Sequence, residues 1–289
     1  MRNDIPPTNV SRLSFTSQLE FHTYMAQHER MLANIWLWHE TLGNQAEQIK
    51  FPGVCDICEC QTTYTATPAK APEGDRFEFR VPWWKETRCG CDLTNLDRAV
   101  LRVFLDAHDP KHRVYHVGHN SRLRQWLSQR VQNVTSTEYQ EGRKSGEVEG
   151  DVRFEDLTRL SFDVGQFDCI ICVEILEHIP DYKAALREMA RTLAAGGRAI
   201  LSFPWLGRDT YDHLIRAELK PDGSINHILP PEYHEDPVKP QGILSFRSFG
   251  WRILDDLRAA DFSSASAEFV FGPLHGYMTL LNPVVVGIR

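Results

Sequence analysis

The sequence contains no long hydrophobic run. Its apolar stretches, such as Val284 to Ile288, are far shorter than the roughly 20 residues that a membrane helix needs. The first residues also lack the basic-then-apolar pattern of a secretory signal. From these two absences we expect a protein without a membrane span and with a cytoplasmic location.

The sequence also lacks an excess of basic charge. Its formal net charge is −7, so the chain as a whole offers no positive field to a phosphate backbone. This balance disfavours a nucleic-acid substrate. With 289 residues, 42% hydrophobic and 25% charged, the chain has the composition of a globular protein with one α/β domain and a smaller accessory module.

The cysteines do not suit a disulfide framework. There are seven, an odd number, and five of them fall in one short stretch: Cys55, Cys58, Cys60, Cys89 and Cys91. In a reducing compartment, clustered thiols more often bind metal than pair. Cys55-x-x-Cys58 has the spacing of a zinc knuckle, and Cys89-x-Cys91 supplies a second pair for a tetrahedral thiolate site. Four thiolates leave no open coordination position, so this zinc would be structural; free buried thiols are the alternative.

The first 110 residues predict a helical and cysteine-rich module. Residues 1–15 show no periodicity and read as a loose arm. Apolar residues recur near helical spacing over 15–42, which predicts one or two helices. Short Thr-, Tyr- and Phe-containing segments within 53–92 indicate small strands around the cysteines, and a further helix is expected over 93–107.

From residue 111 to residue 289 the pattern alternates between strands and helices. The expected strands are 113–117, 133–137, 167–172, 198–203, 266–271 and 284–289. The expected helices are 122–130, 183–193 and 247–260. Such alternation is typical of an α/β fold, a Rossmann-like and mostly parallel sheet with helices on both faces. The irregular stretch of about 205–244 has no periodicity and is expected to form a functional lid.

Two of the candidate cofactor residues follow predicted strands. In an open parallel sheet, a nucleoside cofactor binds beyond the carboxyl ends of the strands. Gly118 follows the first strand and would allow close approach of backbone to ligand. Glu138 follows the second strand, where a carboxylate could accept hydrogen bonds from ribose hydroxyls, although a solvated loop glutamate is an equal alternative. Asp156, followed by Leu157, could bind an adenine amino group.

The segment from Phe167 to Asp181 is the most informative part of the sequence. It contains a buried strand that leads into a Leu-Glu-His turn, and a Gly-Gly pair at 196–197 precedes the next strand. The segment resembles class I S-adenosylmethionine (SAM)-dependent methyltransferases of the type 11-like subgroup that has this Leu-Glu-His turn. The resemblance covers about 112–289. It implies cofactor contacts from Gly118, Glu138, Asp156, Leu157 and Glu174.

The first motif departs from the family pattern. His116 stands where an acidic residue is usual, and Asn120 stands where a second glycine is usual. The departure leaves open reduced SAM affinity or a SAM-using reaction other than methylation, such as cyclisation or elimination. A catalytically inactive SAM-binding scaffold is a further alternative.

Two histidines are candidate general bases for the reaction. His178 lies in the turn after the strand expected over 167–172, and His234 lies in the long loop. The free pKa of histidine, about 6.5, suits proton transfer near neutral pH. A structural role in the turn and a surface position are the respective alternatives. Candidate substrate-binding residues are His227, Tyr233, Asp236 and Arg247.

The cysteine module carries a resemblance of its own. It is similar to zinc-ribbon-like N-terminal segments in which two Cys-x-x-Cys pairs precede an arginine-bearing helix. Arg98 fits that pattern, whereas the second pair is one residue short. Either Cys60 replaces one of the four ligands or the geometry of the site is adjusted.

Three segments carry a narrower resemblance: Pro231-Glu232-Tyr233-His234-x-Asp236-Pro237, the following Gly242-x-Leu244, and Phe249-Gly250-Trp251 before a predicted helix. They resemble methyltransferases of bacterial surface-glycan and secondary-metabolite pathways. We therefore expect O- or N-methylation of a small-molecule or glycan intermediate. The turn after the strand expected over 167–172 lacks the Asn/Asp-Pro-Pro-aromatic pattern of enzymes that methylate the amino groups of bases. This absence again argues against a nucleic-acid substrate. A homodimer is left open.

Overall fold

A computed structural model of the chain describes residues 10–30, 32–33, 37, 46–70, 79–83, 87–119, 121–234, 241–278 and 283–289. The chain divides into two compact units. Unit 1 comprises Met1–Phe15, Leu19–Ala107 and Glu268–Val284, and unit 2 comprises Thr16–Gln18, His108–Ala267 and Val285–Arg289. The domain boundary near residue 110 stays a prediction, because unit 1 also takes a segment from near the C-terminus.

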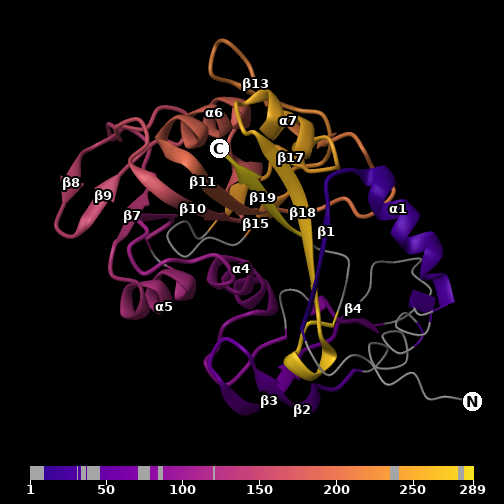
Figure 1. Cartoon of the computed structure of the whole chain (residues 1–289). Helices are drawn as coiled ribbons and strands as arrows, with labels where there is room; N and C mark the ends of the chain where they lie inside the picture. The colour runs from indigo at the N-terminus through magenta and orange to yellow at the C-terminus, as the bar shows by residue number, and fades with distance from the viewer. Residues whose placement is uncertain are drawn as a thin grey trace, which may run out of the picture. The chain divides into compact units, whose positions relative to one another are not determined.

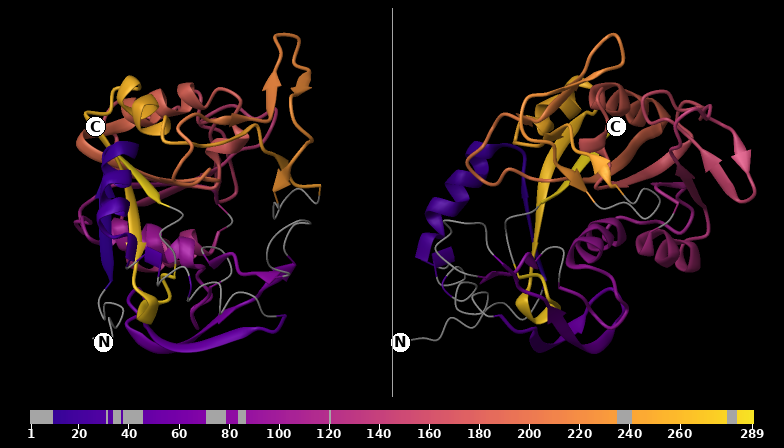
Figure 2. Two further views of the ribbon diagram at one scale, coloured as in Figure 1. Left: turned by 90° about the vertical axis from the view of Figure 1, so that its right-hand side faces the viewer. Right: turned by 180° about the vertical axis from the view of Figure 1, so that it is seen from behind.

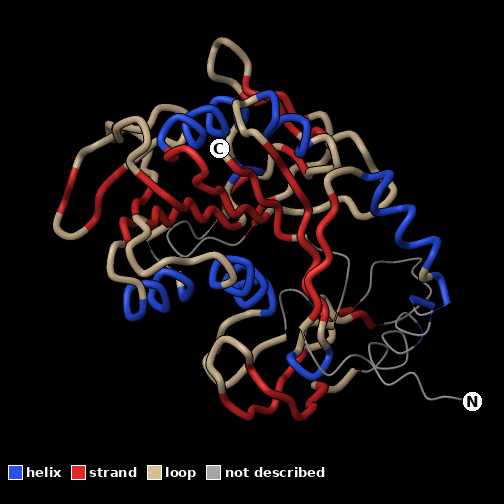
Figure 3. Tube along the Cα trace, viewed as in Figure 1, coloured by secondary structure: helices blue, strands red, loops and turns tan. Residues whose placement is uncertain are grey.

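Unit 2 is built on a mostly parallel sheet, as the sequence predicts. Its parallel strands are β6 (Val114–Val117), β7 (Val134–Glu138), β9 (Val152–Phe154), β10 (Phe167–Val173) and β11 (Leu193–Ser202). Two strands pair in the antiparallel sense: β19 (Val284–Ile288) pairs with β11, and β8 (Val148–Glu149) pairs with β9. Strand β18 (Ser264–Phe271) lies next to β19 in the sheet. The strand order is β18-β19-β11-β10-β6-β7-β9-β8, and the β8–β9 hairpin ends the sheet at the left of Figures 1 and 3.

Helices cover both faces of this sheet. They are α5 (Arg122–Arg130), α6 (Tyr182–Thr192) and α7 (Ile253–Ala259), and Figure 1 shows α6 and α7 on one face and α5 on the other. The central strand β10 is accordingly buried on both sides, with Ile170 and Ile171 inaccessible to solvent. Helix α5 begins where predicted because the Ser121 side chain accepts a hydrogen bond from the backbone N–H of Arg124.

Two expectations for unit 2 are wrong. The helix expected from residue 247 begins at Ile253, because β17 (Arg247–Ser248) pairs with β12 (Leu214–Ile215). The stretch expected to be irregular contains two further hairpins: β13 (Ala217–Leu219) with β14 (Ile225–His227), and β15 (Tyr233–His234) with β16 (Ile243–Leu244). Strands of two or three residues are too short to show periodicity. The turn of the β13–β14 hairpin lies at the top of both views in Figure 2.

A buried polar network joins α6 and α7 in unit 2. The Asp256 carboxylate accepts hydrogen bonds from Tyr182 Oη at 2.7 Å and His213 Nε2 at 2.8 Å, and Lys183 Nζ lies 3.0 Å away. Gly250 N donates to His213 Nδ1, which leaves the proton of the ring on Nε2. Burial raises the pKa of Asp256, but these three partners outweigh it and lower that pKa to about 2.

This network predicts an acid-sensitive contribution to stability. A carboxylate with a depressed folded-state pKa stabilises the fold above its unfolded pKa, near 3.9, and loses that effect as pH falls through the folded value. We expect about 2 kcal/mol of unfolding free energy to disappear between roughly pH 4 and pH 2. Urea unfolding over this range would measure it. Asp256→Asn should be less stable at pH 7 and lose this dependence, whereas Asp255→Asn, at an exposed neighbouring position, should keep it.

Unit 1 contains a hairpin, a capped helix and one strand that the sequence does not predict. The hairpin is β2 (Ile49–Cys55) with β3 (Cys60–Ala66), and the helix predicted over 93–107 is confirmed as α4 (Asn95–Leu105). Thr94 and Asp97 form a capping box at its start. Helix α1 (Gln18–Gln27) lies in the predicted helical region, of which 31, 34–36 and 38–42 fall outside the described residues. No helix in the described parts of the chain is long and apolar enough to cross a membrane.

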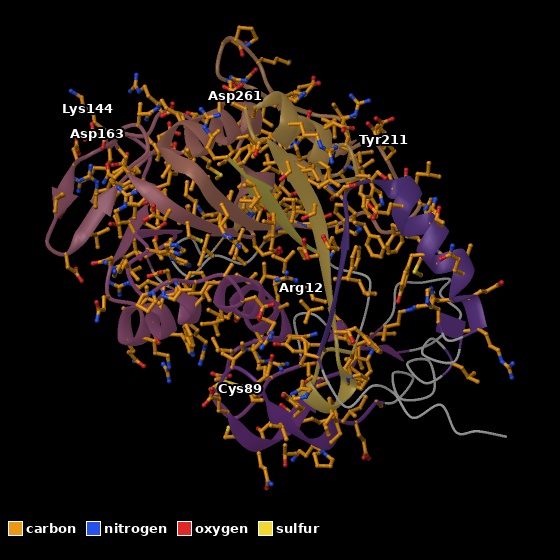
Figure 4. The ribbon with its side chains drawn as sticks, in the orientation of Figure 1. Arg12, Cys89, Lys144, Asp163, Tyr211 and Asp261 are labelled. Carbon is orange, nitrogen blue, oxygen red and sulfur yellow. A yellow bond between two sulfur atoms is a disulfide. The ribbon has the colours of Figure 1, made fainter. Side chains whose placement is uncertain are left out.

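The loose arm expected over residues 1–15 is wrong for its last part. Ser11–Phe15 forms β1, which neighbours β18 in the strand order. Ser14 Oγ donates to Glu268 Oε1 at 2.7 Å, and Arg12, labelled in Figure 4, bridges Glu268 and Asp106. A five-residue edge strand has no strong local signal, and its partner lies more than 250 residues away in the sequence.

A buried arginine is central to unit 1. Arg98 is inaccessible to solvent, and its guanidinium lies 4.7 Å from the ring centre of Tyr64 and 5.0 Å from that of Tyr277. Its Nη1 donates to the carbonyl oxygen of His275 at 2.6 Å. The two rings and the carbonyl together stabilise the buried charge.

The tight packing around Arg98 leaves no room for a side chain at Gly276. This glycine has φ +75°, and a Cβ there would lie 2.7 Å from Tyr64 Cε1 and 2.9 Å from Arg98 Nη2. We expect Gly276→Ala to lower the free energy of unfolding by about 2–4 kcal/mol, from the left-handed backbone and the overpacking together. Gly223→Ala has a similar φ of +83° and open space around the Cβ, so denaturant unfolding should show only the smaller backbone cost. Equal losses in the two variants would contradict the packing argument.

Candidate functional site

The predicted cofactor residues meet at one edge of the unit 2 sheet. Because β6, β7, β9 and β10 run parallel and in register, their carboxyl ends lie at the same edge. Gly118 and Glu174 directly follow their strands, Glu138 is the last residue of β7, and Asp156 comes two residues after β9. Four positions that are far apart in the sequence are thus brought to one edge.

Gly118 has a backbone conformation that favours glycine. Its φ is +98°, and its N–H donates to the carbonyl oxygen of Thr137 at 2.9 Å. The neighbouring His116 is 2% exposed, and burial lowers its pKa to about 4. The ring at this position is therefore neutral at pH 7, where the family usually has a carboxylate. Asn120 lies outside the described residues.

Glu138 is held in place by two backbone groups. Its Oε2 accepts from His119 N at 3.0 Å and its Oε1 accepts from Tyr139 N at 3.2 Å. The first bond links the turn after β6 to the end of β7. Because a carboxylate offers about four lone-pair directions, two remain available to other donors. This geometry differs from that of a freely solvated loop glutamate.

Asp156 begins a compact turn beside apolar side chains. Its Oδ1 accepts from the N–H and the hydroxyl of Thr158 at 2.8 and 2.7 Å, which is a turn stabilised by the aspartate side chain. Leu157 and Phe162 are buried. The turn fixes one carboxylate oxygen and leaves the other for a donor.

Glu174 stands in an unusual backbone conformation at the end of β10. Its φ is +53°, which for a residue other than glycine costs of order 1–3 kcal/mol. Its N–H donates to the carbonyl oxygen of Ser202, and its Oε1 accepts from the Ser202 hydroxyl at 2.9 Å. Such strain is typical of residues positioned for a function.

The turn after Glu174 brings the two candidate bases together. It contains the short helix Leu176–His178, and the rings of His178 and His234 lie with their centres 5.0 Å apart. His178 Nδ1 lies 2.9 Å from the carbonyl oxygen of Leu244, which can only accept, so Nδ1 carries the proton and Nε2 a lone pair.

Glu177 is the residue of this cluster that sequence reasoning missed. Its side chain is fully buried, and its Oε1 lies 3.6 Å from His178 Nε2 and 3.4 Å from His234 Nδ1. The nearby carboxylate of Glu177, and secondarily that of Glu232, raises the pKa of His234. The sequence showed a glutamate in the Leu-Glu-His turn, but it did not show that the Glu177 side chain is buried beside the two histidines.

The candidate substrate residues have different surroundings. Arg247 is buried and donates to the backbone carbonyls of Ile179 and Pro180, so its guanidinium braces the turn after β10. Tyr233 is exposed and precedes His234 on β15, and His227 is exposed on β14. Asp236 lies outside the described residues. Their roles in substrate binding stay predictions.

The cysteine cluster lies in unit 1. Cys55 ends β2 and Cys58 lies in the turn that leads to β3; the sulfur atoms of these two, Cys89 and Cys91 all lie within 4.8 Å of one another. Cys89, labelled in Figure 4, is joined to Cys91 by a disulfide, and the exposed Cys60 is not in the group. When Cys89 and Cys91 are reduced, the four convergent sulfurs are the donor set that suits zinc, whose thiolate ligands lie at about 2.3 Å from the ion. The group is thus compatible with a zinc module.

The strand order, with parallel strands at the centre of the sheet, defines a Rossmann-like fold. Residues 116–201 match the family described as a methyltransferase domain.

Curated relatives match only part of the chain. A ubiquinone biosynthesis O-methyltransferase of Xanthomonas oryzae is 41% identical over 56 residues, which is 19% of this chain and 23% of the relative. One of the same name from Idiomarina loihiensis is 27% identical over 117 residues, 39% of this chain and 42% of the relative. A SAM-dependent methyltransferase structure from Mesorhizobium loti is 14% identical, with a TM-score of 0.40, over 66% of this chain and 98% of that one. The chain thus spans less than half the length of these curated relatives.

Proposed function

We propose that the protein is a SAM-dependent methyltransferase that methylates a hydroxyl group of a small molecule. The observation that carries the proposal is the arrangement of Gly118, Glu138, Asp156 and Glu174 at one sheet edge, next to the turn that holds His178. The two relatives named O-methyltransferases favour oxygen over nitrogen as the acceptor atom. A glycan or secondary-metabolite intermediate is the finer expectation from the sequence.

The cofactor residues would each bind a different part of SAM. The backbone at Gly118 would approach the methionine moiety, the two free directions of the Glu138 carboxylate would accept from the ribose hydroxyls, and Asp156 with Leu157 would hold the adenine. Glu174, beside Ser202, would complete the contact at the end of β10. SAM supplies the sulfonium methyl group and the leaving group.

The protein's own task is to position the acceptor and remove a proton. The free lone pair on His178 Nε2 can accept the hydroxyl proton, and the bond from Nδ1 to Leu244 keeps the ring oriented. Residues of the long loop, including Tyr233, would exclude water and align the acceptor oxygen with the methyl group. His234 would take part through its contact with Glu177.

Binding of SAM and of S-adenosylhomocysteine, measured by calorimetric titration, tests the cofactor site. Asp156→Ala should weaken binding at least tenfold, about 1.4 kcal/mol. Asp163→Ala, at an exposed aspartate labelled in Figure 4, should bind as the wild type does. Absence of heat with both ligands would contradict the proposal.

The reaction type is tested by mass spectrometry after incubation with SAM and a panel of phenols, catechols and sugar alcohols. Methyl transfer adds one CH2 to the acceptor, whereas cyclisation or elimination does not. Binding of SAM without turnover of any acceptor would favour an inactive scaffold.

A further inference from the structure

A second group of metal-binding side-chain types lies in unit 2, at the turn after β10. In the described part of the chain, one ligand atom each from Glu177, His178 and His234 lie within 4.8 Å of one another. Glu177 is fully buried, and neither carboxylate oxygen receives a hydrogen bond of normal geometry from the described residues. A buried carboxylate in this state is costly unless a cation lies beside it.

The two histidines are oriented as metal ligands are. His178 Nδ1 donates to the carbonyl of Leu244, and His234 Nε2 lies 3.1 Å from Glu232 Oε1 as a donor. The opposite nitrogens, His178 Nε2 and His234 Nδ1, both face Glu177 Oε1, at 3.6 and 3.4 Å. Histidines that bind metal almost always anchor their outer nitrogen on a carboxylate or a carbonyl in this manner.

We propose that Glu177, His178 and His234 bind a divalent first-row transition metal ion. Two imidazoles and one carboxylate are a donor set that suits Fe2+, Mn2+ and Zn2+. Ligands at about 2.1 Å from one ion lie roughly 3.0–3.4 Å apart, so the two distances to Glu177 are close to those of a loaded site. Three protein ligands leave open coordination positions for water or another oxygen ligand.

The inference about which group fills the open coordination positions rests on the proposed function, whereas the inference that the site binds a metal ion does not. In a methyltransferase, the acceptor hydroxyl would coordinate there. Metal coordination makes a bound hydroxyl more acidic, so the ion itself would promote loss of the hydroxyl proton. In the metal-bound protein His178 would then serve as a ligand of the ion and not as the general base.

The two metal sites of the chain differ in chemistry, which allows them to be measured separately. Thiolates favour zinc, and carboxylate with imidazole accepts Mn2+. The full chain, loaded with zinc, is titrated with Mn2+, and free Mn2+ is followed by its electron paramagnetic resonance signal. We expect one Mn2+ per chain, displaced by a further equivalent of Zn2+.

Variants assign the site. Glu177→Gln and His234→Ala should each weaken Mn2+ binding at least thirtyfold, and Glu218→Gln, at an exposed position on β13, should leave it unchanged. Because Glu177 is buried, His234→Ala, at a partly exposed position, tests the same ligand set without a change in the core.

The SAM titration separates this inference from the proposed function. Wild-type protein that binds neither Mn2+ nor a second equivalent of Zn2+ overturns the metal site, as does unchanged binding in His234→Ala. Loss of SAM binding with Mn2+ binding retained would instead overturn the methyltransferase proposal alone.

Discussion

Glu138→Ala is expected to weaken SAM binding by about 100-fold, which is close to 3 kcal/mol. The alanine removes the carboxylate that would bind both ribose hydroxyls, and each hydrogen bond to a charged group is worth about 1.5–3 kcal/mol. It also removes the acceptor for His119 N, which ties the turn after β6 to β7. Calorimetric titration with SAM and S-adenosylhomocysteine measures the loss.

A matched control lies three residues further along the chain, in the loop after β7. Glu141 is exposed and follows the strand instead of ending it, so Glu141→Ala should bind SAM as the wild type does. Circular dichroism and thermal unfolding of Glu138→Ala would show whether the fold is intact. A folded Glu138→Ala protein that retains wild-type affinity would remove the ribose contact from the proposal.

Cys55→Ser is expected to release zinc and to unfold much of unit 1. The thiolates of Cys55, Cys58, Cys89 and Cys91 would hold the ion in their reduced form, and the free energy of zinc binding in small structural sites is about 10–16 kcal/mol at pH 7. The ion would tie the β2–β3 turn to the segment that carries Cys89 and Cys91, and so would contribute to the stability of this part of unit 1. Metal analysis and limited proteolysis would measure the effect.

Cys60→Ser is the control, because Cys60 is exposed and outside the group of four sulfurs. It should retain one zinc per chain and the wild-type proteolysis pattern. Alkylation of the native protein, followed by intact-mass measurement before and after reduction, distinguishes zinc thiolates from the Cys89–Cys91 disulfide. A stable disulfide in protein free of zinc would overturn the zinc proposal.

The sequence determined the class of fold and the positions of its main elements. Strand β10 and helices α5 and α6 follow from local patterns, because a buried parallel strand is largely apolar and an amphipathic helix repeats every 3.6 residues. The same patterns placed Gly118 and Glu138 just after strand ends, whereas Asp156 follows β9, a strand that the sequence did not predict. The sequence also singled out four cysteines whose sulfurs prove to lie together.

Tertiary structure alone decided which distant residues meet. Strand β1 and the segment 268–284 enter unit 1 through partners far away in the chain, and no local pattern encodes such pairing. Helix α7 begins later than predicted because Arg247 belongs to the two-residue strand β17, which pairs with β12. Likewise, His234 lies beside Glu177 only because β15 and β16 fold back over the turn after β10. Local propensity acts over a few residues, whereas these contacts depend on how the whole chain packs.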